Sequence, residues 1–141
     1  DDIILMHGDL VFEQEILKEM ICQPVSCMAI DKSAPLPEKD FKAVLNEGII
    51  EKVGVEFFRN AVAAQPLYYL KKKDWRVWLD AILDFCAQDN RNVYAENALN
   101  TVSNRTKLCP YDISGHLCAE VDNPEDLERI RKFLAELEGD K

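Results

Sequence analysis

A short apolar run near the start of the chain, closed by a glycine and an aspartate, narrows the choice of fold more than any other segment. Residues 3–6 are all large and apolar, and Gly8 and Asp9 follow almost at once. Such a run predicts a strand buried on both faces of an α/β sheet. Because open α/β sheets bind ligands at the carboxyl ends of their strands, we expect Asp9 to lie at a ligand-binding edge.

The rest of the chain alternates between short strands and amphipathic helices. Apolar residues at helical spacing predict a helix that ends before Pro24, a helix opened by an Asp74 N-cap, and a last helix over Pro124–Leu137 with Asn123 as its N-cap. Strands are predicted at Ser26–Ile30, Phe41–Leu45, Ile49–Val53, Pro66–Leu70 and His116–Val121, with a helix closing Val93–Val102 and a turn-rich segment over Pro110–Gly115.

The two long helices each carry an apolar stripe that we expect to face the core. The predicted inward residues are Trp75, Trp78, Leu79, Ile82, Leu83 and Phe85 in the first, and Leu127, Ile130, Phe133, Leu134 and Leu137 in the second. The pattern predicts a single α/β domain over residues 1–141, with a mixed sheet and flanking helices. The five glycines are too scattered to form the glycine-rich phosphate loop of a doubly wound sheet.

Composition excludes several classes of function. A net charge of −9 repels nucleic acid, and Lys71–Lys73 is too short a basic stretch to reverse that. No apolar run is long enough to cross a membrane, so we expect a cytoplasmic protein. Five cysteines without a C-x-x-C pair predict buried reduced thiols and neither disulfides nor a zinc ribbon.

Two aspartates are candidates for a metal site. Asp9 follows the first predicted strand, and Asp122 follows the predicted strand over His116–Val121. Carboxylates from separate strand ends, completed by substrate phosphates and water, suit the octahedral shell of Mg²⁺. The alternatives are structural: Asp9 could bind loop amides, and Asp122 or Asn123 could cap the last helix.

Two motifs resemble those of nucleotidyltransferases, especially the branch similar to phosphocholine cytidylyltransferases. One is the run over residues 3–9, and the other is Glu120–Leu127, which reads E-V-D-N-P-E-D-L. Between them, Asp40–Val44 with Gly48–Ile50 resembles the hairpin of the family, and Tyr94–Leu99 resembles its acceptor-side segment. The resemblance covers nearly the whole chain and implies a partial nucleotide-diphospho-sugar-transferase-like, Rossmann-like fold.

The resemblance also implies roles for individual residues. Asp9 and Asp122 would hold a catalytic Mg²⁺, Glu120 would lie beside them, and Lys42 would approach a phosphate. The residues implied to line the acceptor pocket are Gln65, Tyr68, Tyr94 and Glu96. The alternatives remain open, because a lysine in a hairpin is commonly solvated and aromatic residues at such positions commonly belong to the core.

The implied reaction is nucleotidyl transfer. An acceptor phosphate oxygen would attack the α-phosphorus of an NTP, CTP in the first place, and pyrophosphate would leave. The acceptor would be phosphocholine-like or a sugar phosphate. For a quaternary ammonium, aromatic rings would supply cation–π contacts and Glu96 a counter-charge.

The sequence departs from the family pattern in one respect. Nucleotidyltransferases open with a Gly-x-Gly-x-x-x-Arg-type loop and a later lysine that bind the triphosphate, and this sequence contains neither. We therefore expect the isolated chain to be inactive, and to self-associate through the exposed edge of its first strand. The alternatives are a catalytically silent interaction or regulatory domain with this fold and a generic α/β binding protein.

Overall fold

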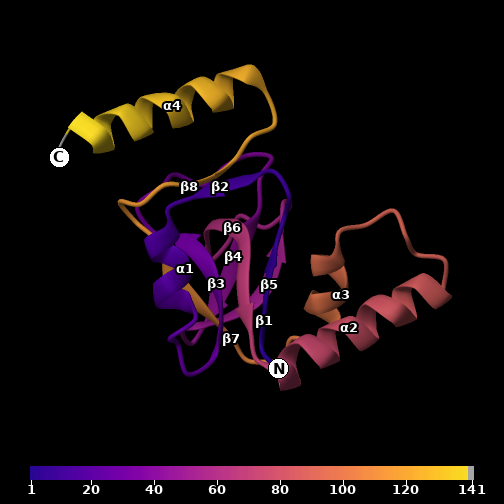
Figure 1. Cartoon of the computed structure of the whole chain (residues 1–141). Helices are drawn as coiled ribbons and strands as arrows, with labels where there is room; N and C mark the ends of the chain where they lie inside the picture. Colours follow the sequence, from indigo (N-terminus) through magenta and orange to yellow (C-terminus); the bar gives the residue numbers. More distant parts are fainter. Residues whose placement is uncertain (140–141) are drawn as a thin grey trace.

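The computed structural model describes residues 1–139, which form three layers around a central sheet (Figure 1). The helix α1 covers one face of the sheet, α2 and α3 cover the other, and α4 extends away from the body (Figure 1). The elements are β1 (Ile3–Met6), β2 (Leu10–Phe12), α1 (Gln14–Met20), β3 (Ser26–Asp31), β4 (Lys42–Asn46), β5 (Ile49–Gly54), β6 (Ala61–Leu70), α2 (Lys72–Ala87), α3 (Ala95–Thr101), β7 (Leu108–Asp112), β8 (Cys118–Glu120) and α4 (Pro124–Gly139).

The main sheet is mixed, which confirms the predicted α/β class. Its strand order is β5-β4-β6-β3-β7, and β1 also pairs with β6. The β3–β7 pair is parallel, whereas the other pairs of this sheet are antiparallel. The strands β2 and β8 form a separate antiparallel pair.

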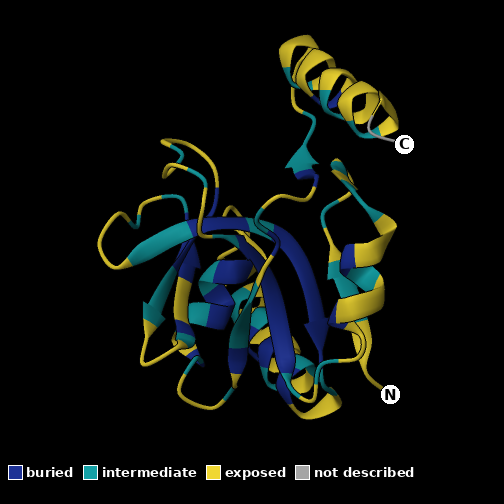
Figure 2. Cartoon of the chain, turned by 90° about the vertical axis from the view of Figure 1, so that its left-hand side faces the viewer, coloured by how far each residue is buried: buried dark blue, intermediate teal, exposed yellow. Residues whose placement is uncertain are grey.

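Successive side chains along the central strands pack alternately in two separate hydrophobic cores, one on each face of the sheet. Met28 and Ile30 of β3 pack in the core that α2 and α3 cover, while Cys27 and Ala29 belong to the core that α1 covers. In β6, Tyr68 and Leu70 lie in the first core, and their neighbours along the strand lie in the second. The period of two residues therefore explains why the central strands are buried on both faces (Figure 2).

One side of β6 is shared by two strands. Ala61–Ala63 pairs with the beginning of β4, and Leu67–Leu70 pairs with β1, while β3 runs along the opposite side. Pro66 lies between these two pairings, where β6 changes its partner strand. Proline has no N–H group, and at this point the sheet loses no hydrogen bond through its absence. We call the gap between the end of β1 and the start of β4 the sheet split.

The hairpin β4–β5 is the hairpin predicted from the sequence. Glu47 and Gly48 both have positive φ angles, of 52° and 78°. A two-residue turn of this kind matches the twist of the paired strands, and glycine adopts it without steric cost. The predicted strand over Ser26–Ile30 and the predicted final helix are also confirmed.

Three predictions about local structure were wrong in whole or in part. The strand β1 is only half-buried, with Ile3 and Met6 exposed, because β6 is its one partner among the described strands. Asp74 is not an N-cap: α2 begins earlier, and the buried Asp74 carboxylate instead accepts hydrogen bonds from Ser26 Oγ at 2.5 Å and Lys107 N at 3.2 Å. Of the segment predicted as turn-rich, Pro110–Asp112 belongs to β7, an edge strand that tolerates Pro110, while Ser114 and Gly115 form the expected turn.

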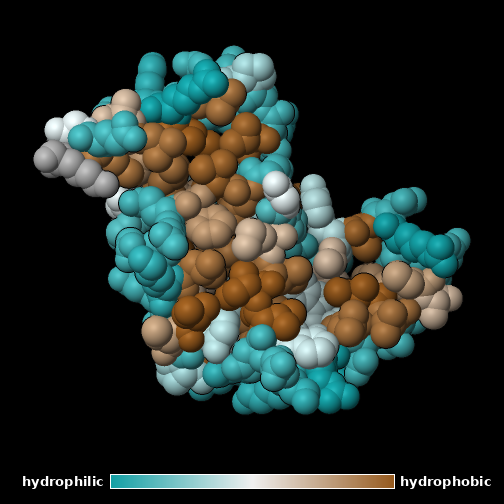
Figure 3. All heavy atoms as spheres, in the orientation of Figure 1, coloured by the Kyte–Doolittle hydropathy of each residue, from teal (hydrophilic) through white to brown (hydrophobic). Residues whose placement is uncertain are grey.

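The predicted inward faces of the long helices are only partly buried. In α2, Trp78 is buried but Leu79 and Leu83 are exposed, and in α4 Ile130 is buried but Leu127 and Leu134 are exposed. The space-filling view shows apolar side chains gathered on this face of the molecule, below α4, over the sheet and over α2 (Figure 3). Periodicity identified these stripes correctly, but it does not tell which part of a stripe finds a partner.

The five cysteines were predicted to be buried and reduced. All five thiols are free, yet only Cys27 and Cys118 are buried, and burial raises the pKa of these two thiols to about 11 and about 12. Cys22 and Cys86 are exposed, so the prediction of buried thiols holds only in part.

Within residues 1–139, no helix combines the length and the apolar character needed to cross a membrane.

Candidate cation-binding site

The sheet split brings together residues that follow β1 and residues that precede β4. The His7 N–H group donates to Pro66 O at 3.1 Å, and Ala64 N–H donates to Phe41 O at 3.1 Å, so both chain segments remain attached to β6 where the ladder divides. The rings of His7 and Phe41 meet edge to face across the split, with centroids 5.5 Å apart. Asp9 and Asp40 flank these two rings in sequence and therefore enter the same region.

The small β2–β8 pair carries two further acids to the split. Leu10 pairs with Glu120, and Val121 N–H donates to Asp9 O at 2.9 Å. Beyond β8, the Asn123 side chain accepts a hydrogen bond from Asp126 N at 2.9 Å and so caps α4. Because Asn123 supplies the cap, the Asp122 carboxylate is left to face the site.

Four carboxylates converge here, and we call them the acidic cluster: Asp9, Asp40, Glu120 and Asp122. Ligand atoms of Asp40, Glu120 and Asp122 lie within 4.8 Å of one another, and those of His7, Asp9 and Glu120 form a second such group. The two strand-end aspartates singled out from the sequence are therefore neighbours. Asp9, close enough to share a hydrogen bond, raises the pKa of Asp122.

The cluster is electrostatically unfavourable without a cation. Burial, followed by the charges of Asp9 and Asp122, raises the pKa of Glu120 to about 7. Like charges at this spacing disfavour the ionised form, and a bound cation would reverse that effect. A hard divalent ion such as Mg²⁺ takes oxygen ligands of this type, so the donor set fits Mg²⁺.

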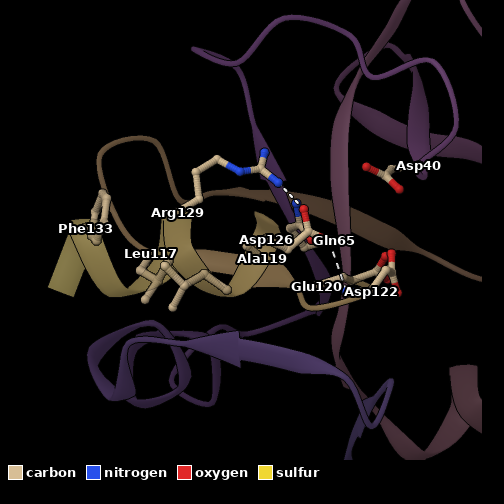
Figure 4. Close-up of a pocket in the computed structure, with 10 residues that line it drawn as sticks. Asp40, Gln65, Leu117, Ala119, Glu120, Asp122, Asp126, Arg129 and Phe133 are labelled. Carbon is tan, nitrogen blue, oxygen red and sulfur yellow. Dashed lines mark hydrogen bonds and ion pairs between the residues drawn. The ribbon is translucent and has the colours of Figure 1, made fainter. Parts of the chain in front are cut away.

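Two clefts open on the acidic cluster and share Asp40, Glu120 and Asp122. One runs below α4 and is also lined by Gln65, Arg129 and Phe133. In it, Asp122 and Asp40 come from different loops and turn their carboxylates toward each other, while Arg129 is paired with Asp126 (Figure 4). The other cleft is also lined by His7, Asp9, Lys39, Phe41, Val55 and Tyr94.

The ammonium group of Lys42 is not available to a phosphate in this structure. Lys42 is fully buried, and its Nζ donates to the carbonyl oxygens of Pro37 at 2.5 Å, Asp40 at 3.0 Å and Glu38 at 3.4 Å. An ammonium group has three donors, and these carbonyls engage them. Lys42 therefore holds the loop that positions Asp40, and the geometry runs against the predicted phosphate contact.

The predicted acceptor residues divide into two sets. Gln65 lines the cleft below α4, and Tyr94 is exposed in the other cleft, where its ring meets Phe41 edge to face at 5.0 Å. Tyr68 and Glu96 are buried below, and Tyr68 OH donates to Glu96 Oε1 at 2.9 Å. Tyr68 is thus a core residue that is linked to the site through Glu96.

Two residues of the site were not identified from the sequence, namely His7 and Asp40. His7 stands directly before the Gly8-Asp9 pair, and Asp40 directly before the predicted hairpin, so each adjoins a motif that was recognised. Nothing in the local pattern distinguishes Asp40 from a solvated loop residue. Its place in the site depends on the buried Lys42 contact, which only the tertiary structure reveals.

The raised pKa of Glu120 predicts how stability depends on pH. The folded-state pKa of Glu120 lies above the ordinary 4.5. The contribution of Glu120 to the stability of the fold is therefore fully present below about pH 4.5 and is lost as the pH rises to about 7. In a chelator, the melting temperature should therefore fall between pH 5 and pH 8. Glu120→Gln should reduce that fall, measured by circular dichroism, whereas an equal fall in Glu120→Gln and the wild type would show that Glu120 does not titrate in this range.

Solved structures with this fold exist, although no family model and no curated protein matches the chain. The inositol-1-phosphate CTP transferase from T. maritima aligns with a TM-score of 0.68 and 19% identity over 96% of this chain and 55% of its own. A UDP-glucose pyrophosphorylase in complex with UDP-glucose aligns with a TM-score of 0.65 and 15% identity, over 96% of this chain and 57% of its own.

A third solved structure, the nucleoside-diphosphate-sugar pyrophosphorylase from Vibrio cholerae RC9, aligns with a TM-score of 0.59 and 12% identity over 91% of this chain and 55% of its own. At these identities the likeness concerns the fold. The chain spans a little over half the length of the proteins it matches. It therefore has a partial sugar-phosphate nucleotidyltransferase fold, as the two sequence motifs predicted.

Proposed function

We propose that this chain supplies the metal-binding and acceptor-binding part of a nucleotidyltransferase. The observation that carries the proposal is the meeting of four carboxylates at the sheet split, on a fold that solved nucleotidyltransferases share. In the proposed reaction an acceptor phosphate oxygen forms a bond to the α-phosphorus of an NTP. The bond from that phosphorus to the β-phosphate oxygen breaks, and pyrophosphate leaves.

Asp9, Asp40, Glu120 and Asp122 would hold Mg²⁺ in this proposal. When bound, the ion would supply charge neutralisation for the phosphates, which carboxylates alone would repel. The chain's own contribution is placement. The β2–β8 pair sets the distance between Asp9 and Asp122, and Lys42 holds the backbone from which Asp40 reaches the cluster.

The cleft beside His7 is the proposed acceptor site. Its walls combine the aromatic rings of Phe41 and Tyr94 with the charges of Asp9, Asp40 and Glu120. An aromatic and anionic wall suits a quaternary ammonium group, which favours a phosphocholine-like acceptor over a sugar phosphate. A sugar would instead need a set of hydrogen-bond donors and acceptors around its hydroxyl groups.

The choice of the nucleotide base in this proposal is based on the sequence resemblance alone. The solved relatives that share the fold are described as a CTP transferase and a UDP-glucose pyrophosphorylase, so more than one base occurs among them. We favour CTP because the motifs at both ends of the chain resemble those of cytidylyltransferases. A catalytic assay therefore has to compare CTP with UTP.

Removing one carboxylate of the acidic cluster tests the proposed cation site. Asp122→Asn keeps the shape of the side chain but removes a charged ligand, so Mg²⁺ affinity measured by calorimetry should fall at least about ten-fold. The matched control is Glu125→Gln on the exposed start of α4, which should leave affinity unchanged. Equal Mg²⁺ affinity in Asp122→Asn and the wild type would refute this role.

Acceptor choice is tested at Tyr94. Tyr94→Leu removes the ring and should weaken phosphocholine binding in the presence of Mg²⁺ by about 0.5 to 2 kcal/mol, roughly two-fold to thirty-fold. Tyr94→Phe keeps the ring and should bind like the wild type. If both variants bind phosphocholine equally well, or if glucose 1-phosphate is the tighter ligand of the wild type, the quaternary-ammonium assignment fails.

A second function has one observation in its favour. Leucines on α2 and α4 are exposed, and apolar side chains gather on the face shown in Figure 3, as in a domain that binds another protein surface without catalysis. Calorimetry separates the two functions. Binding of phosphorylated ligands that depends on Mg²⁺ supports the transferase proposal, and its complete absence supports the interaction domain.

A further inference from the structure

His7 stands between two carboxylates, one on each ring nitrogen. Its Nε2 lies 3.2 Å from Glu96 Oε1, and its Nδ1 lies 3.8 Å from Glu120 Oε1. Glu96 is almost completely buried, whereas the His7 side chain is one third exposed and lines the cleft. The imidazole thus links a buried acid to the acidic cluster.

The contact with Glu96 determines which ring nitrogen carries the proton. A carboxylate can only accept hydrogen bonds, and Glu96 Oε1 already accepts one from Tyr68 OH at 2.9 Å. His7 Nε2 therefore donates, which leaves the lone pair of Nδ1 directed toward Glu120 in the neutral ring. Histidines that bind metals are oriented in this way, with the second nitrogen donating to a carboxylate.

An independent observation points to a missing positive charge. The second oxygen of Glu96, Oε2, is buried and has no hydrogen-bond partner within residues 1–139. A buried anionic oxygen without a partner is costly unless a cation lies nearby. The buried ammonium of Lys42 is engaged by loop carbonyls and does not fill this role.

We propose that His7 Nδ1, Asp9 and Glu120 bind a divalent transition-metal ion such as Zn²⁺, next to the Mg²⁺ site of the acidic cluster, with which this site shares Asp9 and Glu120. The ligand atoms of His7, Asp9 and Glu120 lie within 4.8 Å of one another. Two ligands of one such ion lie about 3 to 3.5 Å apart, so small side-chain movements complete the site. This site goes beyond the proposed function, because transfer as proposed above needs only carboxylate ligands.

The chemistry of the donors decides between metals. Imidazole nitrogen suits Zn²⁺ and its neighbours in the first transition row, whereas Mg²⁺ prefers oxygen ligands and keeps its water. The His7 site should therefore discriminate against Mg²⁺. Mg²⁺ binding by the acidic cluster should not depend on the imidazole at all.

Nitrogen-15 NMR of the histidine rings tests the site without any activity assay. The chain has only two histidines, His7 and His116, and His116 also lies near a carboxylate, with Nδ1 3.3 Å from Glu13 Oε2. Signals are assigned with His116→Gln. On addition of ZnCl₂ to the metal-free chain, the Nδ1 signal of His7 should move to the position of a coordinated nitrogen while His116 stays unchanged, and MgCl₂ should move neither.

Calorimetry with matched variants measures the contribution of each group. His7→Gln should weaken Zn²⁺ binding at least about ten-fold, and Glu96→Gln about 10- to 100-fold through the loss of its hold on the imidazole. His116→Gln should change Zn²⁺ affinity less than two-fold, and none of the three should alter Mg²⁺ affinity. Zn²⁺ binding that is equal in His7→Gln and the wild type would overturn the proposal.

The wild-type NMR titration decides the matter even where a variant does not fold. A His7 signal that ignores Zn²⁺, or one that moves no more than that of His116, also overturns the proposal. The result is separable from the Mg²⁺ test, because Asp122 is not a ligand of this site. Zn²⁺ coordination by His7 would stand even if Asp122→Asn had no effect on Mg²⁺.

Discussion

The sharing of one side of β6 between β1 and β4 is the constraint on which the site depends. Each strand pairs with only part of β6, so the end of one and the start of the other face each other across Pro66. The loops that leave these strands cannot continue the ladder and instead carry His7, Asp9 and Asp40 to one place. The β2–β8 pair then adds Glu120 and Asp122 from a distant part of the sequence.

This arrangement stores electrostatic repulsion at a defined point of the fold. Four carboxylates face two clefts, and burial together with like charges raises the pKa of Glu120 to about 7. The buried Lys42 does not relieve the repulsion, because its ammonium group binds the carbonyls of the loop around Asp40. The fold thus holds together a negatively charged site that a cation would stabilise. Clusters of this kind are more typical of functional sites than of purely structural charge networks.

Local patterns predicted the elements better than their surroundings. The hairpin, the strand β3 and the helix α4 follow from turn residues, apolar runs and the Asn123 cap, all of which act over a few residues. The three-residue strand β2 is too short to leave a clear pattern, and β7 is hidden by Pro110, whereas β8 was predicted within the longer range His116–Val121. The burial of side chains was predicted least well. Leu79 and Leu134 belong to apolar helix stripes but are exposed, because the local sequence does not determine which part of a stripe packs against another element.

The candidate site shows the same division. Asp9 and Asp122 were predictable because both follow strands, and the resemblance to nucleotidyltransferases drew attention to Glu120, Tyr94 and Glu96. Asp40 depends on the Lys42 contact, and the orientation of His7 depends on Glu96, which lies 89 positions away in the chain. Contacts of that sequence separation arise only when the whole fold is assembled. The expected self-association through β1 and the roles of the site residues stay predictions.

The proposed function requires that the acidic cluster binds divalent cations at the sheet split. The most direct measurement is a crystal structure of the chain grown with Mn²⁺, with the ion located by its anomalous scattering. The anomalous map should contain a peak in contact with carboxylate oxygens of the acidic cluster, Asp122 among them. A map with no peak at the cluster, or with peaks only elsewhere on the surface, would contradict it.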